Sequence, residues 1–362
     1  MSGIEHALIG GATFVIVALI IFWVKNDPVR YRRLIGLATI FTFVLIVLGA
    51  YVRLSDAGLG CPDWPGCYGN LTPYHSSAEI KSAEANQPGG PVSMAKAWKE
   101  MGHRYLAMFV GACIAAILLI AWRNRRTFSQ SPVLATCIAG VVIVQATLGA
   151  WTVTMLLKPA IVTSHLIGGM LLLVLLGWLA LRQYKEHFTN WNEGCPVTVT
   201  PALKIIAAMA LAIVAAQIIL GGWVSTNYAA LACSDFPQCN GQWIPSEMKF
   251  SDAFHIIRPL GVGPDGELLT IESLRAIHWV HRAGALVVVI FLLFAMILFW
   301  RFAGLRREMF VLGLLLTLQV LLGVANIIGS LPLPVAVAHN GCAALLLLCL
   351  IWINFKLHQT RM

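Results

Sequence analysis

Nine long apolar runs, almost free of charged residues, constrain this chain of 362 residues more than any other feature. A helix needs about 20 consecutive apolar residues to cross the hydrocarbon core of a bilayer. Inside lipid the backbone N–H and C=O groups must bond within the segment, so such runs form helices. The runs cover residues 7–24, 34–54, 100–121, 133–155, 160–181, 202–226, 274–300, 308–328 and 334–355. The sequence therefore predicts an all-α polytopic membrane protein.

The composition excludes an ordinary soluble domain. Charged residues make up 11% of the chain and hydrophobic residues 59%, whereas soluble domains contain about 25% charged residues. The formal net charge of +9 comes from basic residues spread over short loops, not from one basic patch. We therefore expect the lipid bilayer, and no nucleic acid, as a partner of this surface.

Basic residues occupy every second connection between the apolar runs. Lys and Arg mark the cytoplasmic side of short loops, so we expect the N-terminus outside and the C-terminus in the cytoplasm. The run at 7–24 has neither a basic segment before it nor a cleavage pattern, which favours a retained anchor helix over a signal peptide. The basic residues are Lys25, Arg30, Arg32, Arg33, Arg123, Arg125, Arg126, Arg182, Lys185, Arg301, Arg306, Arg307, Lys356 and Arg361.

Two outer loops carry related cysteine motifs, Cys61-Pro-Asp-Trp-Pro-Gly-Cys67 and Cys233-Ser-Asp-Phe-Pro-Gln-Cys239. Each motif stands between the first and second runs of a group of four, which indicates an internal duplication. An even number of spans gives both copies the same orientation, with a pseudo-twofold axis along the membrane normal. We predict two pseudo-symmetric four-helix bundles plus an extra N-terminal helix. The expected parts are the anchor helix and loop 1–33, the first repeat 34–181, the cytoplasmic linker 182–201, the second repeat 202–355 and the cytoplasmic tail 356–362.

Four histidines lie inside predicted helices, at similar depths near the outer side: His103, His165, His281 and His339. In each repeat they lie on the second and fourth helices, which run in the same direction. Polar residues at membrane depth are costly and usually functional. Two facing imidazoles can supply both axial ligands of a heme iron, whereas zinc takes three or four protein ligands. Heme is favoured over zinc and over plain hydrogen bonds between helices.

An arginine directly follows one histidine of each pair, at Arg104 and Arg282. A guanidinium can bond a carboxylate with two parallel hydrogen bonds. We therefore expect Arg104 to help bind a substrate heme and Arg282 to bind a heme propionate, with snorkelling to lipid headgroups as the alternative. Glycines on the same helices would admit a flat macrocycle, but close helix packing explains them better. They are Gly49, Gly149, Gly168, Gly169 and Gly323.

The two repeats differ at Glu100, which stands three residues before His103, because His278 takes the equivalent place before His281. Residues three apart on a helix share a face. A carboxylate beside a heme-binding histidine can transfer protons. The alternative is that the helix dipole favours an acidic residue near the start of the helix. The difference suggests chemistry in the first half and an electron-carrying heme in the second. His278 is an alternative ligand there.

The cysteine pairs of the two outer loops face the side of the membrane where disulfides persist. Five intervening residues, with proline among them, allow each loop to close, so we predict the disulfides Cys61–Cys67 and Cys233–Cys239. This spacing is not the usual one for zinc. Cys195 in the predicted linker is expected to be a free thiol. The remaining cysteines lie in apolar runs and are expected to pack as small hydrophobic residues: Cys113, Cys137, Cys342 and Cys349.

The segment Glu100-Met-Gly-His103-Arg104, with the cysteine pairs and the later histidines in order, resembles the heme A synthase family over residues 34–355. The resemblance implies an oxidoreductase that oxidises the C8 methyl group of heme O to the formyl group of heme A for cytochrome oxidase assembly. It implies a bacterial cytoplasmic membrane, with heme O synthase and an electron donor as partners, and a homo-oligomer is compatible with it. The additional run at 7–24 departs from the eight-helix core of the family.

The same resemblance assigns roles to the histidines. It implies that His103 and His165 hold the substrate heme O while Glu100 assists catalysis, and that His281 and His339 ligate a heme b. Two other functions stay open on the residues alone. A quinone-linked thiol oxidoreductase would use outward cysteine pairs, and a b-type cytochrome electron carrier would use the histidines but leave Glu100 unexplained.

Overall fold

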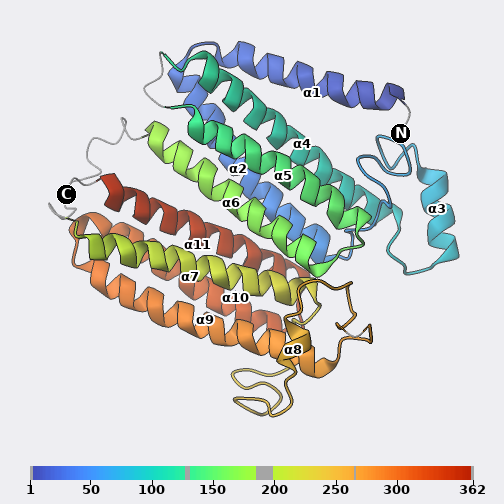
Figure 1. Cartoon of the computed structure of the whole chain (residues 1–362), viewed down its shortest axis with the longest axis vertical. Helices are drawn as coiled ribbons and strands as arrows, with labels where there is room; N and C mark the ends of the chain where they lie inside the picture. The colour runs from blue at the N-terminus through green and yellow to red at the C-terminus, as the bar shows by residue number, and fades with distance from the viewer. Residues whose placement is uncertain (1–2, 127–130, 185–198, 265, 360–362) are drawn as a thin grey trace. The chain divides into compact units, whose positions relative to one another are not determined.

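The computed structural model describes residues 3–126, 131–184, 199–264 and 266–359, with side chains described from residue 11 onward. Within these ranges the regular elements are helices and none is a strand, which confirms the predicted all-α class. The helices are α1 (Gly3–Val24), α2 (Pro28–Leu54), α3 (Ser77–Asn86), α4 (Met94–Arg123), α5 (Val133–Thr154), α6 (Pro159–Tyr184), α7 (Pro201–Thr226), α8 (Phe250–Ala253), α9 (Ile271–Trp300), the short 3-10 helix η2 (Ala303–Leu305), α10 (Arg306–Ile328) and α11 (Leu333–Gln359) (Figure 1).

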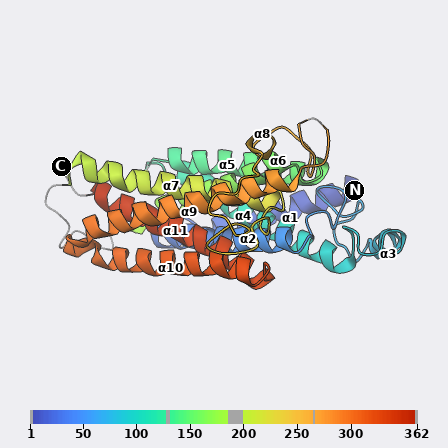
Figure 2. The same cartoon turned by 90° about the horizontal axis from the view of Figure 1, so that it is seen from below.

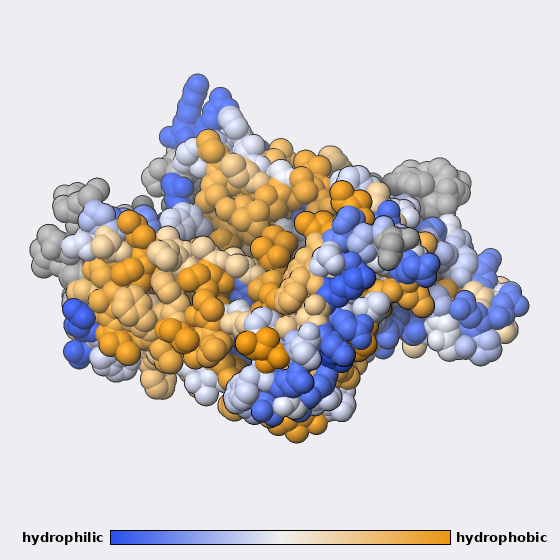
Figure 3. All heavy atoms as spheres, turned by 60° about the horizontal axis from the view of Figure 1, so that its bottom comes forward, coloured by the Kyte–Doolittle hydropathy of each residue, from blue (hydrophilic) through white to orange (hydrophobic). Residues whose placement is uncertain are grey.

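Eight helices in the described part of the chain are long and apolar enough to cross a membrane: α2, α4, α5, α6, α7, α9, α10 and α11. The described apolar part of α1 is shorter, Gly11–Val24. Large apolar side chains remain exposed on these helices, such as Ile143, Ile297 and Phe310, and hydrophobic residues cover wide areas of the face in Figure 3. Exposed apolar surface on this scale requires a lipid environment. The chain is a multi-pass membrane protein, as predicted.

Local sequence signals determine where the helices begin. The Asp27 carboxylate accepts the N–H of Val29 at 2.8 Å, and Pro28 takes the first turn of α2. The Ser93 hydroxyl accepts the N–H of Lys96 at 3.3 Å and caps α4. Because α4 begins at Met94, its first turns carry the Glu100 and His103 side chains to the same end of the helix.

The chain forms two compact units. Unit 1 comprises residues 1–157 and 164–180, and unit 2 comprises residues 158–163 and 181–362. Unit 1 therefore holds α1, α2, α4, α5 and most of α6, whereas unit 2 holds α7, α9, α10 and α11. The sequence-based boundaries remain a prediction. Residues 185–198 of the predicted linker, with Cys195, lie outside the described residues.

The core of unit 1 lies between α2 and α4, which pack along each other, with α1 against α4. Ile35, Ile114 and Ile117 are almost completely buried there. The small helix α3 lies beyond the N-terminal end of α4 and contacts it (Figures 1 and 2). The loop that carries the first cysteine pair therefore lies at the same end of unit 1 as Glu100 and His103.

Unit 2 repeats this arrangement with α7 against α9 and α11, and α10 against α11. At the end away from the cysteine loop, the Lys356 ammonium donates to Glu308 Oε1 at 2.9 Å and to the Gly304 carbonyl at 2.7 Å. These two hydrogen bonds hold α11 against η2 and the first turn of α10. The cysteine loop and the histidines lie at the opposite end of the unit.

Candidate heme sites and disulfide caps

Each of the four predicted histidines lies against a glycine of a neighbouring helix. A Cβ atom on the glycine would come close to the imidazole Cε1: 3.0 Å for Gly49 and His103, 3.4 Å for Gly149 and His165, 3.0 Å for Gly221 and His281, and 3.2 Å for Gly323 and His339. Such distances are tight for any side chain. The glycines on α2, α5, α7 and α10 therefore seat the imidazoles, a role more specific than the helix packing expected from sequence. Gly168 instead faces the side chain of Gln145, and Gly169 faces Ile46.

Three of these imidazoles keep a buried nitrogen without a partner in the described part of the chain. The atoms are Nδ1 of His103, His165 and His339. A buried polar atom that lacks a hydrogen bond is uncommon and calls for an explanation. In a histidine such a nitrogen can hold a proton or bind a metal.

Within each unit, one histidine lies near the other. His103 and His165 of unit 1 lie within electrostatic reach of each other, as do His281 and His339 of unit 2. No group of three or more His, Cys, Asp or Glu side chains suited to a metal ion occurs among the described residues. A heme iron needs only two axial imidazoles. The residues therefore fit one heme in each unit, and these ligand pairs stay a prediction.

Two glutamines that sequence reasoning did not use hold the histidines of unit 2. The Gln217 amide nitrogen lies 3.0 Å from His281 Nδ1 and donates to the His281 carbonyl at 2.9 Å. The Gln319 amide nitrogen lies 3.2 Å from His339 Nε2. Hydrogen bonds of this kind orient an imidazole and determine its tautomer. The correspondence of Gln145 and Gln319 in the repeats was the available signal, whereas Gln217 has no glutamine counterpart.

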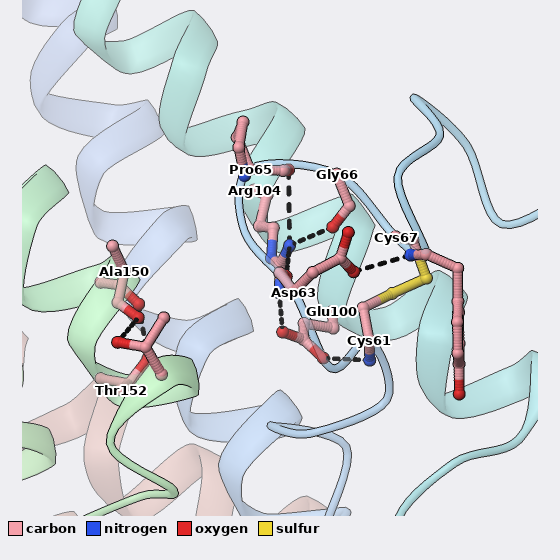
Figure 4. A network of polar contacts seen from close by, with 12 residues as sticks. Cys61, Asp63, Pro65, Gly66, Cys67, Glu100, Arg104, Ala150 and Thr152 are labelled. Carbon is pink, nitrogen blue, oxygen red and sulfur yellow. Dashed lines mark hydrogen bonds and ion pairs between the residues drawn. A yellow bond between two sulfur atoms is a disulfide. The ribbon is translucent and has the colours of Figure 1, made fainter. Parts of the chain in front are cut away.

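Glu100 links the heme site of unit 1 to the first cysteine loop (Figure 4). Its carboxylate, 4% exposed, accepts the Cys61 N–H at 2.9 Å and forms an ion pair with Arg104 one turn further along α4. Arg104 also donates to the carbonyls of Asp63 at 2.9 Å and Gly66 at 2.6 Å. Glu100 and Arg104 together therefore bond both the start and the middle of the disulfide loop to α4.

Unit 2 builds the same connection with His278 in the place of Glu100. His278 Nδ1 lies 3.2 Å from the Cys233 backbone nitrogen, and its Nε2 lies 3.2 Å from Arg282 Nε. Arg282 donates further to the carbonyls of Asp235 at 2.8 Å and Gln238 at 2.7 Å. Both ring nitrogens of His278 therefore face N–H groups of the protein, and the one that carries the lone pair accepts one of them. This arrangement favours His281 as the ligand on α9.

Both predicted disulfides are present, with Cα–Cα distances of 4.9 Å for Cys61–Cys67 and 4.6 Å for Cys233–Cys239. An aspartate inside each motif shapes its loop. The Asp63 carboxylate accepts the N–H of Tyr68 at 2.6 Å and of Gly69 at 2.7 Å.

The second loop is built in the same way. The Asp235 carboxylate accepts the N–H of Gly241 at 2.8 Å and that of Asn240. These hydrogen bonds, led by that of Gly241, lower the pKa of Asp235. Asp235 is therefore charged at neutral pH and holds the turn that follows it.

The predicted propionate role of Arg104 and Arg282 remains a prediction. In the structure, the guanidinium groups are directed to the backbone of the disulfide loops and not to the space between the histidines. Sequence reasoning did not foresee this contact. The signal that pointed to it was the co-occurrence of Cys-x5-Cys and His-Arg in both repeats.

A membrane protein with a duplicated helical unit, and with a histidine pair beneath a disulfide loop in each copy, belongs to the class of polytopic heme-binding proteins. More specifically, the chain belongs to the family of cytochrome oxidase assembly proteins, whose family model matches residues 32–351. The match covers both units and every candidate site residue. The additional helix α1 lies outside it.

Known proteins are similar to this chain over most of their length. A heme A synthase of Shewanella oneidensis is 39% identical over 326 residues, which are 90% of this chain and 96% of that protein. A heme A synthase of Halalkalibacterium halodurans is 28% identical over 70% of this chain and 77% of its own. One of Rhizorhabdus wittichii is 25% identical over 90% of this chain and 93% of its own.

Proposed function

We propose that this protein is a heme A synthase, an oxidoreductase that oxidises the C8 methyl group of heme O to the formyl group of heme A. The observation that carries the proposal is the buried carboxylate of Glu100, one helical turn from His103, in the unit that also holds His165. Family membership and the 39% identical relative support the same reaction.

In this proposal, His103 and His165 hold the substrate heme O in unit 1. Gly49 keeps the His103 ring in place, because any larger residue would displace it. Glu100 lies on the same face of α4 as His103 and could hold or move a proton in the oxidation of a heme bound there. The Cys61 N–H and Arg104 position that carboxylate.

His281 and His339 hold a resident heme b in unit 2 in this proposal. Gln217 orients the His281 ring and Gln319 the His339 ring. A heme with two axial histidines supplies one-electron transfer when bound. His278 stands in the place of Glu100 in unit 2 and carries no carboxylate, so this unit lacks the group to which we assign the proton transfer.

A thiol oxidoreductase is less consistent with the site. All four disulfide cysteines are buried, with exposed fractions of 0% for Cys61, Cys67 and Cys233 and 2% for Cys239. Thiol–disulfide exchange requires access of a thiolate to one of the sulfur atoms. The disulfides are therefore better suited to hold the loops than to exchange electrons.

Sidedness and partners complete the proposal. The distribution of basic residues supports an orientation with both cysteine loops outside the cytoplasm and the C-terminus inside. Heme O synthase would deliver the substrate, and an electron-transfer partner would act at unit 2. Homo-oligomers are compatible with the exposed apolar helix faces.

Heme analysis of cells tests the function directly. The full chain is produced in a bacterium that makes heme O and lacks its own heme A synthase, and extracted hemes are separated by chromatography. We expect heme A to appear with the intact chain and not with an empty vector. A chain that accumulates in the membrane with heme bound, yet yields no heme A, would contradict the proposal.

A further inference from the structure

Arg258 is a buried cation in the loop between α8 and α9 of unit 2, and its side chain is almost closed to solvent, with an exposed fraction of 3%. Its guanidinium donates to the Val262 carbonyl at 3.2 Å and to the Asn227 side-chain oxygen. Its carbon centre also lies 5.7 Å from the centre of the Trp223 ring. All three partners are uncharged.

The hydrogen-bonding capacity of Arg258 is therefore not filled. A guanidinium has five N–H donors, but the buried Nε has no partner in the described part of the chain. No carboxylate of the described residues forms an ion pair with Arg258. Burial lowers the pKa of Arg258, and nothing offsets this shift. Leaving a buried charge unpaired is costly, so a missing anion is the simplest explanation.

The position of Arg258 indicates where that anion comes from. Trp223 follows Gly221 by two residues on α7, and Gly221 is the glycine that seats His281. Trp223 packs in one cluster with Ile277, which lies one helical turn before His281 on α9. Arg258 therefore lies beside a cluster whose member on α9, Ile277, is one helical turn, roughly 6 Å along the helix axis, from His281.

Unit 1 contains a related arrangement. Tyr51 follows Gly49 by two residues, and the Lys99 ammonium lies 5.0 Å from the centre of its ring. Each unit thus places a cation over the aromatic residue beside its glycine–histidine contact. The cation of unit 2 comes from a different segment and is the more deeply buried of the two.

We propose that Arg258 binds a carboxylate of the heme held by His281 and His339, that is, one of its propionate groups. This inference rests on the proposed heme of unit 2. A lipid phosphate would offer similar chemistry, but the loop closes Arg258 from the surface. Arg258 would then supply the charge at the heme, while Arg282 holds the disulfide loop.

A thermodynamic cycle between the arginine and the propionates tests the proposal. The full chain with His103→Ala, in which heme binding reports on unit 2, is prepared without heme and titrated with iron protoporphyrin IX or its dimethyl ester. With Arg258 present, we expect esterification to weaken binding by roughly 10- to 100-fold, as for the loss of a charge-assisted hydrogen bond. With Arg258→Gln, most of that difference should disappear.

Arg275→Gln is the matched control, because Arg275, unlike Arg258, already forms an ion pair with a carboxylate: its Nη1 lies 3.8 Å from Glu247 Oε2. It should keep the full sensitivity to esterification. Thermal unfolding of the heme-free protein gives a second readout, in which Arg258→Gln should be as stable as its parent or more stable. Arg258→Lys, which keeps the charge, should retain part of the sensitivity.

Two results would overturn the proposal. In the first, esterification weakens heme binding equally in the Arg258 protein and in Arg258→Gln. In the second, Arg258→Gln lowers the thermal stability of the heme-free protein as much as that of the heme-bound protein. If the proposed heme of unit 2 is absent, a separate measurement shows it before any arginine is replaced. The His103→Ala protein then has no low-spin bis-histidine spectrum, or His281→Ala leaves that spectrum unchanged.

Discussion

Glu100 and His278 occupy equivalent positions in the two units but differ in how many hydrogen bonds their side chains can accept. Each faces the N–H of the first cysteine of its loop and the arginine one turn away. A carboxylate accepts both donors, whereas a neutral imidazole has one acceptor nitrogen. The carboxylate of Glu100 is therefore matched to both of its donors, three residues before His103 on α4.

Glu100→Gln should abolish heme A formation without loss of bound heme. The amide keeps an acceptor oxygen for the Cys61 N–H but loses the charge and the titratable proton. Because general acid–base catalysis contributes about 100-fold or more, heme A should fall by at least that factor. Chromatography of extracted hemes measures it, and normal heme A from this variant would refute a catalytic role.

Glu100→His separates the structural role of this position from the chemical one. Unit 2 already connects its cysteine loop to a histidine here, so the variant should fold and keep the Cys61–Cys67 disulfide. Heme A should still be absent. Restored heme A in Glu100→His would show that the position only anchors the loop.

At the scale of elements, α4 and α9 each connect to a loop through one arginine, and α2 and α7 each seat an imidazole through one glycine. The helices therefore act as rigid supports, while the short side chains and carbonyls between them determine the position of each histidine.

Gly49→Ala should weaken heme binding in unit 1. The new Cβ would come 3.0 Å from His103 Cε1, so the ring must move by a few tenths of an ångström. Gly140→Ala on α5 is the control, because nothing lies within 4 Å of its Cβ position. The control should be neutral or slightly stabilising, since alanine favours a helix over glycine by about 1 kcal/mol. Equal heme content in the two variants would argue against the seating role.

The disulfides Cys61–Cys67 and Cys233–Cys239 should protect all four cysteines from alkylation until reductant is added. Peptide mass spectrometry after alkylation, with and without reductant, locates the modified thiols. Replacing Cys61 and Cys67 together by serine should lower the free energy of unfolding by about 2 kcal/mol, the value for a loop of this length. Free thiols at these positions in protein prepared without reductant would contradict the disulfides.

For the whole molecule, duplication supplies two similar histidine pairs, and only that of unit 1 has a glutamate three residues before its first histidine. His281→Ala or His339→Ala should remove the low-spin bis-histidine spectrum of the proposed heme b. His103→Ala or His165→Ala should leave that spectrum largely intact and impair occupancy by the substrate heme. Absorption spectra of the four purified variants decide the assignment. If His103→Ala removes the resident signal and His281→Ala spares it, the roles of the two units are reversed.

The sequence by itself determined the helices, the repeat and the histidine pairs. A helix in lipid satisfies its own backbone, so an uncharged apolar run is sufficient to predict it. A motif that recurs in order identifies the duplication, and its Cys-x5-Cys spacing predicted the disulfides that the structure contains. These features depend on residues close together in the chain.

Only the tertiary structure decided which side chains meet across helices and loops. The rotation of α2 against α4 brings Gly49 to His103, and the path of the first cysteine loop brings its carbonyls to Arg104. Arg258 reaches Trp223 from a loop whose course no periodicity encodes. Such contacts join residues that are distant in sequence, and their energies depend on packing geometry that spacing along the chain does not contain.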